Sequence, residues 1–191
     1  MKKIALTTKE ELNIYMSPVR QQLLRQLSIA TASMTPKMLA DKLQISPSSV
    51  QHHIKKLMLL GLIELDHTEM INGIKARFYK PAQVTVQIGL SQSDDLEEQR
   101  EVLVQDLIAQ VYDGFRKQMS KRICQQGEKN LDALQKWGDI MTGVVHLSSQ
   151  QSQELLKLVT EYIEQHASPT VDSSPWEYAI IAYNAQEMYD E

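Results

Sequence analysis

Apolar residues recur at helical spacing in two short neighbouring stretches, residues 35–43 and 46–60. Each stretch opens with a hydroxyl side chain followed by proline, Thr35-Pro36 in the first and Ser46-Pro47 in the second. A hydroxyl at the N-cap and a proline at the first helical position both favour the start of a helix. The inward-facing positions are Leu39, Ala40 and Leu43 in the first helix, and Val50, Ile54 and Leu57 in the second. The pattern predicts two short helices joined by a tight turn.

Two such helices form a helix-turn-helix, a motif whose second helix enters the major groove of DNA and meets base edges with its N-terminal residues. The alternative is an ordinary helical hairpin whose polar residues only face water. A third helix is predicted over residues 18–31, because another Ser-Pro pair precedes apolar residues at helical spacing. It is expected to complete the core of the motif. A shorter helix is predicted over residues 9–16.

A β-hairpin is predicted directly after the helix pair. Residues 63–68 and 75–80 alternate apolar and polar side chains, and Asn72-Gly73 between them is a strong hairpin signal. A hairpin at this position is the wing of a winged helix-turn-helix. Lys75 and Arg77 fall on one face of the return strand near the hairpin tip. They either contact DNA phosphates or are solvated charges on an edge hairpin.

One long helix is predicted over residues 94–124, where apolar residues recur at about every fourth position. At about 1.5 Å per residue it would be roughly 45 Å long. This length exceeds the reach of a small domain, so part of the apolar stripe is expected to form a homodimer seam. The alternative is that the stripe packs only within its own domain. The candidate dimerisation residues are Leu103, Leu107, Val111, Phe115 and Met119.

The rest of the chain is predicted to form a strand, a helix and a strand. Residues 141–147 and 176–183 are rich in β-branched and aromatic residues and are expected to pair in a small sheet, with a buried helix as the alternative for the second segment. The helix between them, from residue 148 or 149 to about 166, is expected to turn five apolar residues inward. These are Leu155, Leu156, Val159, Tyr162 and Ile163.

The predicted fold class is therefore α+β, with an N-terminal winged helix-turn-helix and a mostly helical C-terminal domain that has a long dimerisation helix and a small sheet. Residues 1–83 are assigned to the DNA-binding domain and residues 84–93 to a linker. Residues 94–191 are assigned to dimerisation, with room for an effector site.

Charge divides the chain in the same way. The net charge is −4, but residues 1–83 hold 12 Lys and Arg against 6 Asp and Glu, a balance of +6. Residues 84–191 hold 8 against 18, a balance of −10. A basic half joined to an acidic half suggests that only the first half meets a polyanion. The single cysteine, Cys124, together with the lack of a long apolar run, favours a cytoplasmic protein without a membrane partner.

The chemistry of enzymes is not evident in the sequence. There is no glycine-rich phosphate loop, no Gly-x-Ser-x-Gly elbow and no His-Glu-x-x-His helix. The acidic residues at 94–101 are expected to form a solvated helix start rather than a catalytic pair. We therefore expect neither an enzyme nor a bound cofactor.

Residues 17–80 resemble the winged helix-turn-helix of ArsR-type bacterial transcription regulators. The resemblance lies in Ser17-Pro18-Val19-Arg20, in Leu39-Ala40-Asp41-Lys42-Leu43, in the segment from Ser46 to Leu57 with His53 at the usual histidine position, and in the wing. Metal-sensing members of that family carry a cysteine pair in the helix before the turn. Residues 37–43 contain neither Cys nor His, so no metal site is expected.

The predicted function is a sequence-specific transcription regulator, acting as a repressor, that binds a palindromic operator in double-stranded DNA as a homodimer. Helix 47–60 is expected in the major groove and wing 63–80 on the backbone or in the minor groove. The alternative is a protein-interaction module, which has no need of the basic charge. The candidate DNA-binding residues are Lys42, Ser46, Ser48, Ser49, Gln51, His52, Lys55, Lys56, Lys75 and Arg77.

A small-molecule effector is left open by the sequence. Aromatic residues of the C-terminal half could line a pocket for it, although aromatic residues at such positions more often belong to a core. The residues concerned are Trp137, Tyr162, Trp176, Tyr178 and Tyr183.

Overall fold

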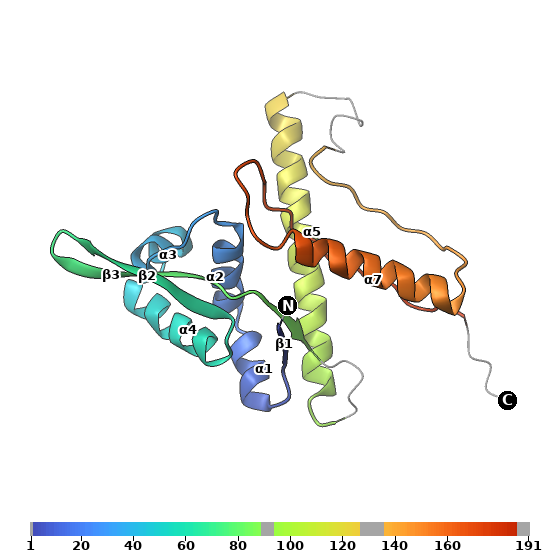
Figure 1. Cartoon of the computed structure of the whole chain (residues 1–191), viewed down its shortest axis with the longest axis horizontal. Helices are drawn as coiled ribbons and strands as arrows, with labels where there is room; N and C mark the ends of the chain where they lie inside the picture. Colours follow the sequence, from blue (N-terminus) through green and yellow to red (C-terminus); the bar gives the residue numbers. More distant parts are fainter. Residues whose placement is uncertain (1, 89–93, 127–135, 187–191) are drawn as a thin grey trace. The chain divides into compact units, whose positions relative to one another are not determined.

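The computed structural model describes residues 2–88, 94–126 and 136–186 (Figure 1). The chain forms two compact units, which we describe separately. One contains residues 1–104 and 143–175, and the other contains residues 105–142 and 176–191. The elements of the first unit are β1 (Lys2–Ala5), α1 (Lys9–Tyr15), α2 (Pro18–Ile29), α3 (Pro36–Leu43), α4 (Pro47–Leu59), β2 (Ile63–Ile71), β3 (Ile74–Pro81), β4 (Val84–Gln87) and α7 (Ser149–Gln165). Helix α5 (Glu97–Gln126) begins in the first unit and continues in the second.

The predicted starts of α3 and α4 are confirmed, together with the caps that cause them. The Thr35 hydroxyl accepts a hydrogen bond from the Met38 amide at 3.2 Å, and the Ser46 hydroxyl accepts one from the Ser49 amide at 3.2 Å. Each cap satisfies an amide that the first turn of a helix leaves without a partner. Between the helices, Gln44 takes a left-handed backbone with φ 55°, which turns the chain sharply. The boundaries of the motif therefore follow from local sequence.

The core of the winged domain lies between α2, α3, α4 and the base of the hairpin. Fully burying one leucine or isoleucine side chain contributes roughly 1.5–3 kcal/mol, so this cluster is the main source of the domain's stability. The predicted inward positions of α4 are confirmed, as are Leu39 and Ala40 of α3. The buried members are Leu23, Leu27, Met34, Leu39, Ala40, Val50, Ile54, Leu57, Leu62, Ile63 and Tyr79.

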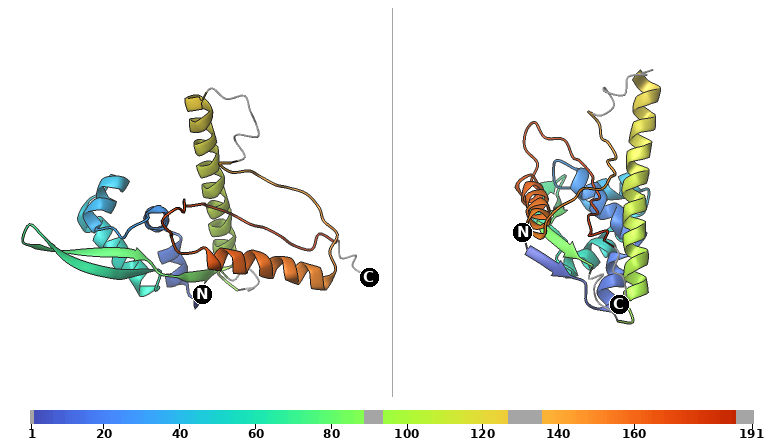
Figure 2. Two further views of the ribbon diagram at one scale, coloured as in Figure 1. Left: turned by 45° about the horizontal axis from the view of Figure 1, so that its top comes forward. Right: turned by 90° about the vertical axis from the view of Figure 1, so that its right-hand side faces the viewer.

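The predicted hairpin is also confirmed. Strands β2 and β3 pair antiparallel from Ile63 opposite Pro81 to Ile71 opposite Ile74. Asn72 and Gly73 form the two-residue turn with φ values of 50° and 78°, and two positive values are the mark of a type I′ hairpin turn. The hairpin projects from the helices in Figure 2. At its base, the backbones of Met34 and Tyr79 exchange two hydrogen bonds of 2.9 Å, which tie the hairpin to the loop before α3.

A second sheet joins the beginning of the chain to the segment that follows the wing. Strand β1 pairs in parallel with β4, with Lys2 opposite Val84 and Ala5 opposite Gln87. Strand β4 lies within the predicted linker, in a stretch that alternates apolar and polar residues, whereas nothing predicted β1. Lys2 and Lys3 give the first residues little apolar character, so the sequence offers no local sign of a strand there.

The start of α5 is more firmly held than a solvated acidic turn would be. Arg100 is buried and donates two hydrogen bonds to Asp94, Nη1 to Oδ1 at 2.7 Å and Nη2 to Oδ2 at 2.8 Å. Asp94 Oδ1 also accepts a hydrogen bond from the Leu96 amide at 2.9 Å. The hydrogen bond from Arg100 lowers the pKa of Asp94, which is therefore a negatively charged anchor at neutral pH. Asp94 itself is exposed at this helix start, as predicted, and the buried member of the pair is Arg100.

The small sheet predicted for the C-terminal half is absent from the described residues. Residues 139–148 and 176–186 contain neither strand nor helix, so the helix alternative for the second segment is wrong as well. A β-branched sequence favours an extended backbone, but a strand forms only where a partner meets its amides and carbonyls. Helix α7 is present as predicted, yet it buries none of its residues, and Leu155, Leu156 and Tyr162 are exposed rather than inward.

The core can be tested by two leucines of α4 that differ in burial. Leu57 is fully buried, and Leu57→Ala should lower the free energy of unfolding by about 2–5 kcal/mol, because it leaves a cavity between packed helices. Leu59 is 75% exposed, and Leu59→Ala should change stability by no more than about 0.5 kcal/mol. Urea unfolding followed by circular dichroism measures both. Equal losses would contradict this description of the core.

Candidate nucleic-acid interface

One side of α4 presents polar side chains to solvent. Four of these residues recur at intervals of three or four positions and therefore share one face of the helix. They are Ser48, Gln51, His52 and Lys55. All of them are exposed, and the core residues of α4 lie on the opposite side. The exposed face carries hydrogen-bond donors, acceptors and one positive charge. These are the groups that recognise base edges and phosphates.

Ser49, His53 and Lys56 lie on the flank of α4 rather than on this exposed face. His53 and Lys56 are partly buried there. Burial lowers the pKa of His53, and electrostatic repulsion from the Arg20 guanidinium lowers it further, so its imidazole is neutral at neutral pH. Its Nδ1 atom is buried without a hydrogen-bond partner in the described part of the chain. Lys56 Nζ lies 3.9 Å from Glu10 Oε1 of α1, so the flank faces neighbouring helices.

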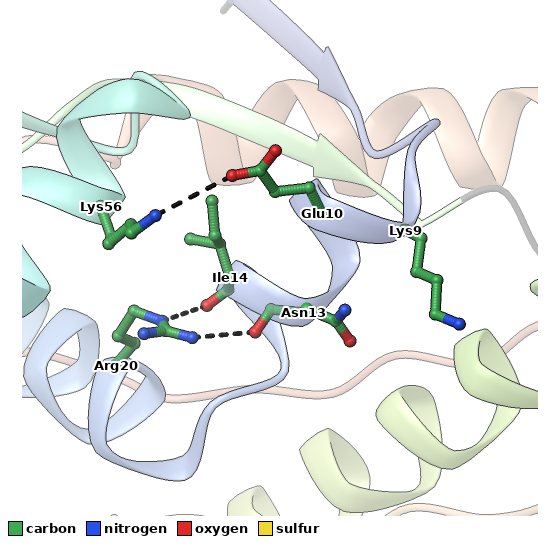
Figure 3. Close-up of a pocket in the computed structure, with 6 residues that line it drawn as sticks. All are labelled: Lys9, Glu10, Asn13, Ile14, Arg20 and Lys56. Atoms are coloured by element: carbon green, nitrogen blue, oxygen red, sulfur yellow. Dashed lines mark hydrogen bonds and ion pairs between the residues drawn. The ribbon is translucent and has the colours of Figure 1, made fainter.

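The corner between α1, α2 and α4 forms an open cleft next to this flank (Figure 3). Arg20 reaches from α2 to the end of α1, where its Nε and Nη2 atoms donate hydrogen bonds to the carbonyl oxygens of Ile14 and Asn13. Gln21 donates another to the Tyr15 carbonyl at 2.6 Å. The last carbonyls of a helix have no partner within the helix. Arg20 and Gln21 thus cap α1 from outside and tie its end to α2.

Two further candidate residues lie just before α4. Ser46 is the N-cap, and its hydroxyl also lies 3.0 Å from the hydroxyl of Ser48. Lys42 is exposed in the last turn of α3, where a positive charge also suits the helix dipole. Both residues lie near the turn that presents the first residues of α4.

The positive charges of the wing differ in their pairing. Lys75 and Arg77 are exposed, and within the described residues neither has an acidic partner at ion-pair distance. Lys80, by contrast, pairs with Asp66 at 2.9 Å and with Glu64 at 3.5 Å. The charges of Lys75 and Arg77 therefore remain available for an anion, whereas that of Lys80 is balanced within the wing.

Asp66 fixes the base of the wing. It accepts hydrogen bonds from His67 Nδ1 at 2.7 Å and from the Ser33 hydroxyl at 3.0 Å, in addition to its ion pair with Lys80. The hydrogen bonds from His67, Lys80 and Ser33 hold the pKa of Asp66 well below its usual range. Beside this cluster, His67 stacks on Phe78 with ring centroids 4.4 Å apart. Ser33, from the loop before α3, thus links the hairpin to the helices.

The wing tip also carries exposed apolar side chains that were not predicted as part of the interface. Met70, Ile71 and Ile74 surround the Asn72-Gly73 turn, and Ile74 is 72% exposed. The sequence signal for an exposed apolar tip was the presence of apolar residues directly beside a hairpin turn. In an alternating strand, however, apolar residues are normally assigned to the buried face, so the signal was overlooked. The tip is therefore apolar at its end, with Lys75 and Arg77 following it.

The dimerisation candidates are placed on α5 as follows. Leu103 is buried in the first unit, whereas Leu107, Val111, Phe115 and Met119 are half-buried in the second. In that unit, Gly138 lies against the side chains of Phe115 and Met119. The Arg122 guanidinium lies 3.6 Å from the ring centroid of Trp137. The half-buried stripe is thus partly covered by its own chain and partly open.

Three other kinds of feature were considered among the described residues: a metal site, a membrane-spanning helix and an effector pocket. Within those residues, no three His, Cys, Asp or Glu side chains come close enough together to hold a metal ion. None of the described helices has both the length and the apolar content needed to cross a bilayer. The five aromatic residues considered as a lining for an effector pocket are all exposed. They are Trp137, Tyr162, Trp176, Tyr178 and Tyr183.

Comparison with known proteins identifies the motif. Residues 15–66 match the family described as helix-turn-helix domain, a range that runs from the end of α1 into β2. These residues therefore form a helix-turn-helix domain, and a winged arrangement agrees with the hairpin that follows. No curated protein matches the chain.

Among solved structures, one similar chain is a possible transcriptional regulator from Methanosarcina mazei Go1. It is 12% identical, and the match covers 55% of this chain and 80% of that one with a TM-score of 0.33. A likeness this weak carries no argument about function.

Proposed function

We propose that this protein is a sequence-specific regulator of transcription that binds double-stranded DNA through its winged helix-turn-helix. The observation that carries the proposal is the exposed face of α4, where Ser48, Gln51, His52 and Lys55 stand opposite a packed core. A rigid second helix whose N-terminal turns present a polar face suits insertion into the major groove. The basic balance of residues 1–83 supports the same partner.

Two kinds of contact are assigned within this interface. Ser48, Gln51 and His52 are the candidates for base edges, because they lie in the first turns of α4. The wing would lie along the backbone or in the minor groove. Phosphate contacts position the protein, and base contacts give specificity. The candidates for phosphates are Lys42, Lys55, Lys75 and Arg77, and those at the margin of the interface are Ser46, Ser49 and Lys56.

The proposal includes a homodimer and a division of the chain into three parts. One recognition helix reads one half-site, and a two-fold dimer would read a palindrome whose half-sites are roughly 34–36 Å apart. The half-buried stripe of α5 from Leu107 to Met119 is the proposed seam. Residues 1–83 would bind DNA, residues 84–93 would link, and residues 94–191 would dimerise. We further propose that the regulator is a repressor that acts by occupying its operator. Its winged domain would have an ArsR-like arrangement.

The wing should make DNA binding dependent on salt. Each phosphate contact contributes roughly −0.9 to the slope of log affinity against log salt concentration. The double variant Lys75→Gln, Arg77→Gln should therefore make the slope shallower by roughly 1.8. Lys80→Gln is the matched control on the same strand, since Lys80 is paired with Asp66 and Glu64. Titration of a fluorescent duplex at several salt concentrations measures the slopes. Identical slopes for the wild type and the double variant would show that these two wing residues do not contact phosphates.

Gln51 should contribute more to specificity than to affinity. Its side chain can make two hydrogen bonds to adenine, which are worth roughly 1–3 kcal/mol of discrimination between bases. Gln51→Ala should reduce the preference for a duplex selected from a random pool by the wild-type protein. Lys55→Gln, on the same face, should weaken selected and random duplexes equally. Competition binding measures both ratios. If Gln51→Ala also lowered both affinities equally, Gln51 would be a backbone contact.

The α5 seam can be tested by placing charge in it. Leu107→Glu, Val111→Glu should dissociate the dimer, because burying unpaired charge costs several kcal/mol, and specific DNA binding should be lost with it. Gln105→Glu, Ala109→Glu adds two negative charges with the same spacing at exposed positions of the helix and should leave the dimer intact. Light scattering coupled to size-exclusion chromatography reports the mass. A dimeric seam variant that still binds its site would place the contact between copies elsewhere.

A further inference from the structure

We propose that the tip of the β2–β3 hairpin is an apolar wedge that enters the minor groove of the bound DNA, opens one base step and bends the duplex. The wedge consists of Met70, Ile71 and Ile74, which surround the turn of the hairpin. This role rests on the proposed function and goes beyond it. It assigns a readout of DNA shape to residues that lie outside the face of α4.

Three apolar side chains are gathered at the hairpin tip and are exposed to solvent. Met70 and Ile74 are 64% and 72% exposed, and Ile71 is 43% exposed. At the other end of the hairpin, Ile63 and Tyr79 are buried in the core. A single exposed apolar residue needs no explanation, but a group of three beside a turn, where polar and small residues are usual, marks an interaction site.

The register of the strands separates two faces at the tip. Ile71 lies opposite Ile74 at the end of the hairpin, and Met70 and Lys75 form the next pair. Successive side chains of a strand point to opposite sides. The two isoleucines therefore share one face, whereas Lys75 and Arg77 share the other. The tip thus combines an apolar end with a cationic side.

The cations beside the wedge indicate that its partner is a polyanion. Lys75 and Arg77 are exposed, and neither has an acidic partner at ion-pair distance in the described part of the chain. The negative potential of a narrow minor groove attracts Lys and Arg. Proteins that bind in this groove also insert Ile, Leu, Met or Phe between base steps. The tip carries both kinds of group side by side.

The wing is fixed to the helix that is proposed to read the major groove. Ile63, the first residue of β2, lies in the same buried cluster as Leu57 of α4. Two hydrogen bonds of 2.9 Å between the backbones of Met34 and Tyr79 hold the other strand. Helix α4 and the hairpin belong to the same compact unit. A duplex bound by α4 therefore meets the tip at a fixed place, whereas no other element of that unit covers the tip.

The hairpin is long enough to reach the neighbouring minor groove. Strand β2 has nine residues, which span roughly 30 Å at about 3.4 Å per residue. The major groove is about 12 Å wide. A hairpin anchored beside a helix in that groove can therefore cross the flanking backbone. Figure 2 shows the hairpin extending beyond the helices of the domain.

Glu69 determines which part of the wing can enter the groove. It is exposed on the same face as the two isoleucines and lies opposite Ala76, one pair farther from the turn. Phosphates would repel its charge if this face lay flat along the backbone. Only the end of the hairpin is suited to enter, so the tip inserts end-on. End-on insertion is the geometry of a wedge.

A wedge makes binding sensitive to the base step that it opens. Unstacking and bending cost free energy, and the cost is smallest at flexible pyrimidine–purine steps such as TA. The wild-type protein should therefore select such a step at a fixed distance from the bases read by α4. No hydrogen bond to a base edge is needed for this preference.

The test compares full-chain variants on the duplex that the wild type selects from a random pool. Threonine is β-branched, so Ile71→Thr, Ile74→Thr keeps the strand preference and removes the apolar end of the wedge. Leu65→Thr is the control, because Leu65 is 44% exposed near the base of the same hairpin. Urea unfolding, with midpoints that should agree among the three proteins, shows whether the variants are folded.

Energy transfer between dyes on the duplex ends reports the bend, and 2-aminopurine at successive positions reports unstacking. Wild type and control should bend the duplex and unstack one step. The double variant should lose about half of the bend or more, and its preference for a TA step over a stiff AA step should fall about tenfold. A wild-type complex without bending or unstacking would overturn the wedge, as would a double variant that bends the duplex like the wild type.

The reactivity of a thiol at the tip shows what covers it. Cys124 is the single cysteine of the chain, so Ile74→Cys, Cys124→Ser has its only thiol at the tip. This thiol should be alkylated rapidly in the free protein, and the selected duplex should slow the reaction several-fold. Slow alkylation of the free protein would show that the chain or a second copy covers the tip. Slowing by phosphatidylglycerol vesicles but not by the duplex would assign the tip to a membrane. Either result would overturn the wedge.

Failure of the wedge can be distinguished from failure of the proposed function. A wild-type protein that selects no duplex from the pool would overturn both. If the wild type selects a duplex, Gln51→Ala loses discrimination and the tip variant still bends that duplex fully, recognition by α4 stands and the wedge falls.

Discussion

The burial of leucine, isoleucine and valine side chains between α2, α3 and α4 is the constraint on which the rest of the winged domain depends. Val50, Ile54 and Leu57 can enter this core only if α4 has one rotation about its axis. That rotation directs Gln51 and Lys55 to solvent. The face available for recognition is therefore fixed by packing on the opposite side of the helix. If α4 were rotated about its axis by one residue, its core positions would turn toward solvent. Most of the apolar burial that stabilises the domain would then be lost.

Local signals made most of this domain predictable. Ser-Pro and Thr-Pro pairs, helical periodicity and the Asn72-Gly73 turn each act within a few residues, and each was confirmed where it was expected. The sequence also selected the polar residues of α4 as a group. It could not predict that Lys55 is exposed whereas Lys56 is partly buried beside α1, where Glu10 lies near Lys56. The contact depends on a neighbour far away in the sequence.

The failures of prediction share a physical cause. Strand β1 was missed because its partner, β4, is distant in sequence and two of its own four residues are lysines. The sheet expected at residues 141–147 and 176–183 was predicted from residue preferences, which specify an extended backbone and no partner. Arg100 was not considered a buried residue, since its burial requires the bidentate pairing with Asp94. In each case a long-range or coupled contact decided the outcome.

The ionic cluster at Asp66 has a consequence for behaviour in acid. Its hydrogen bonds keep the carboxylate charged at pH values where an ordinary aspartate takes up a proton. A carboxylate with a lowered pKa stabilises the folded state above its unfolded pKa, and this contribution is lost only as the pH falls through the lowered value. The link between Ser33, His67 and Lys80 thus persists under mild acidification. The attachment of the hairpin to the loop before α3 is therefore an acid-tolerant part of the winged domain.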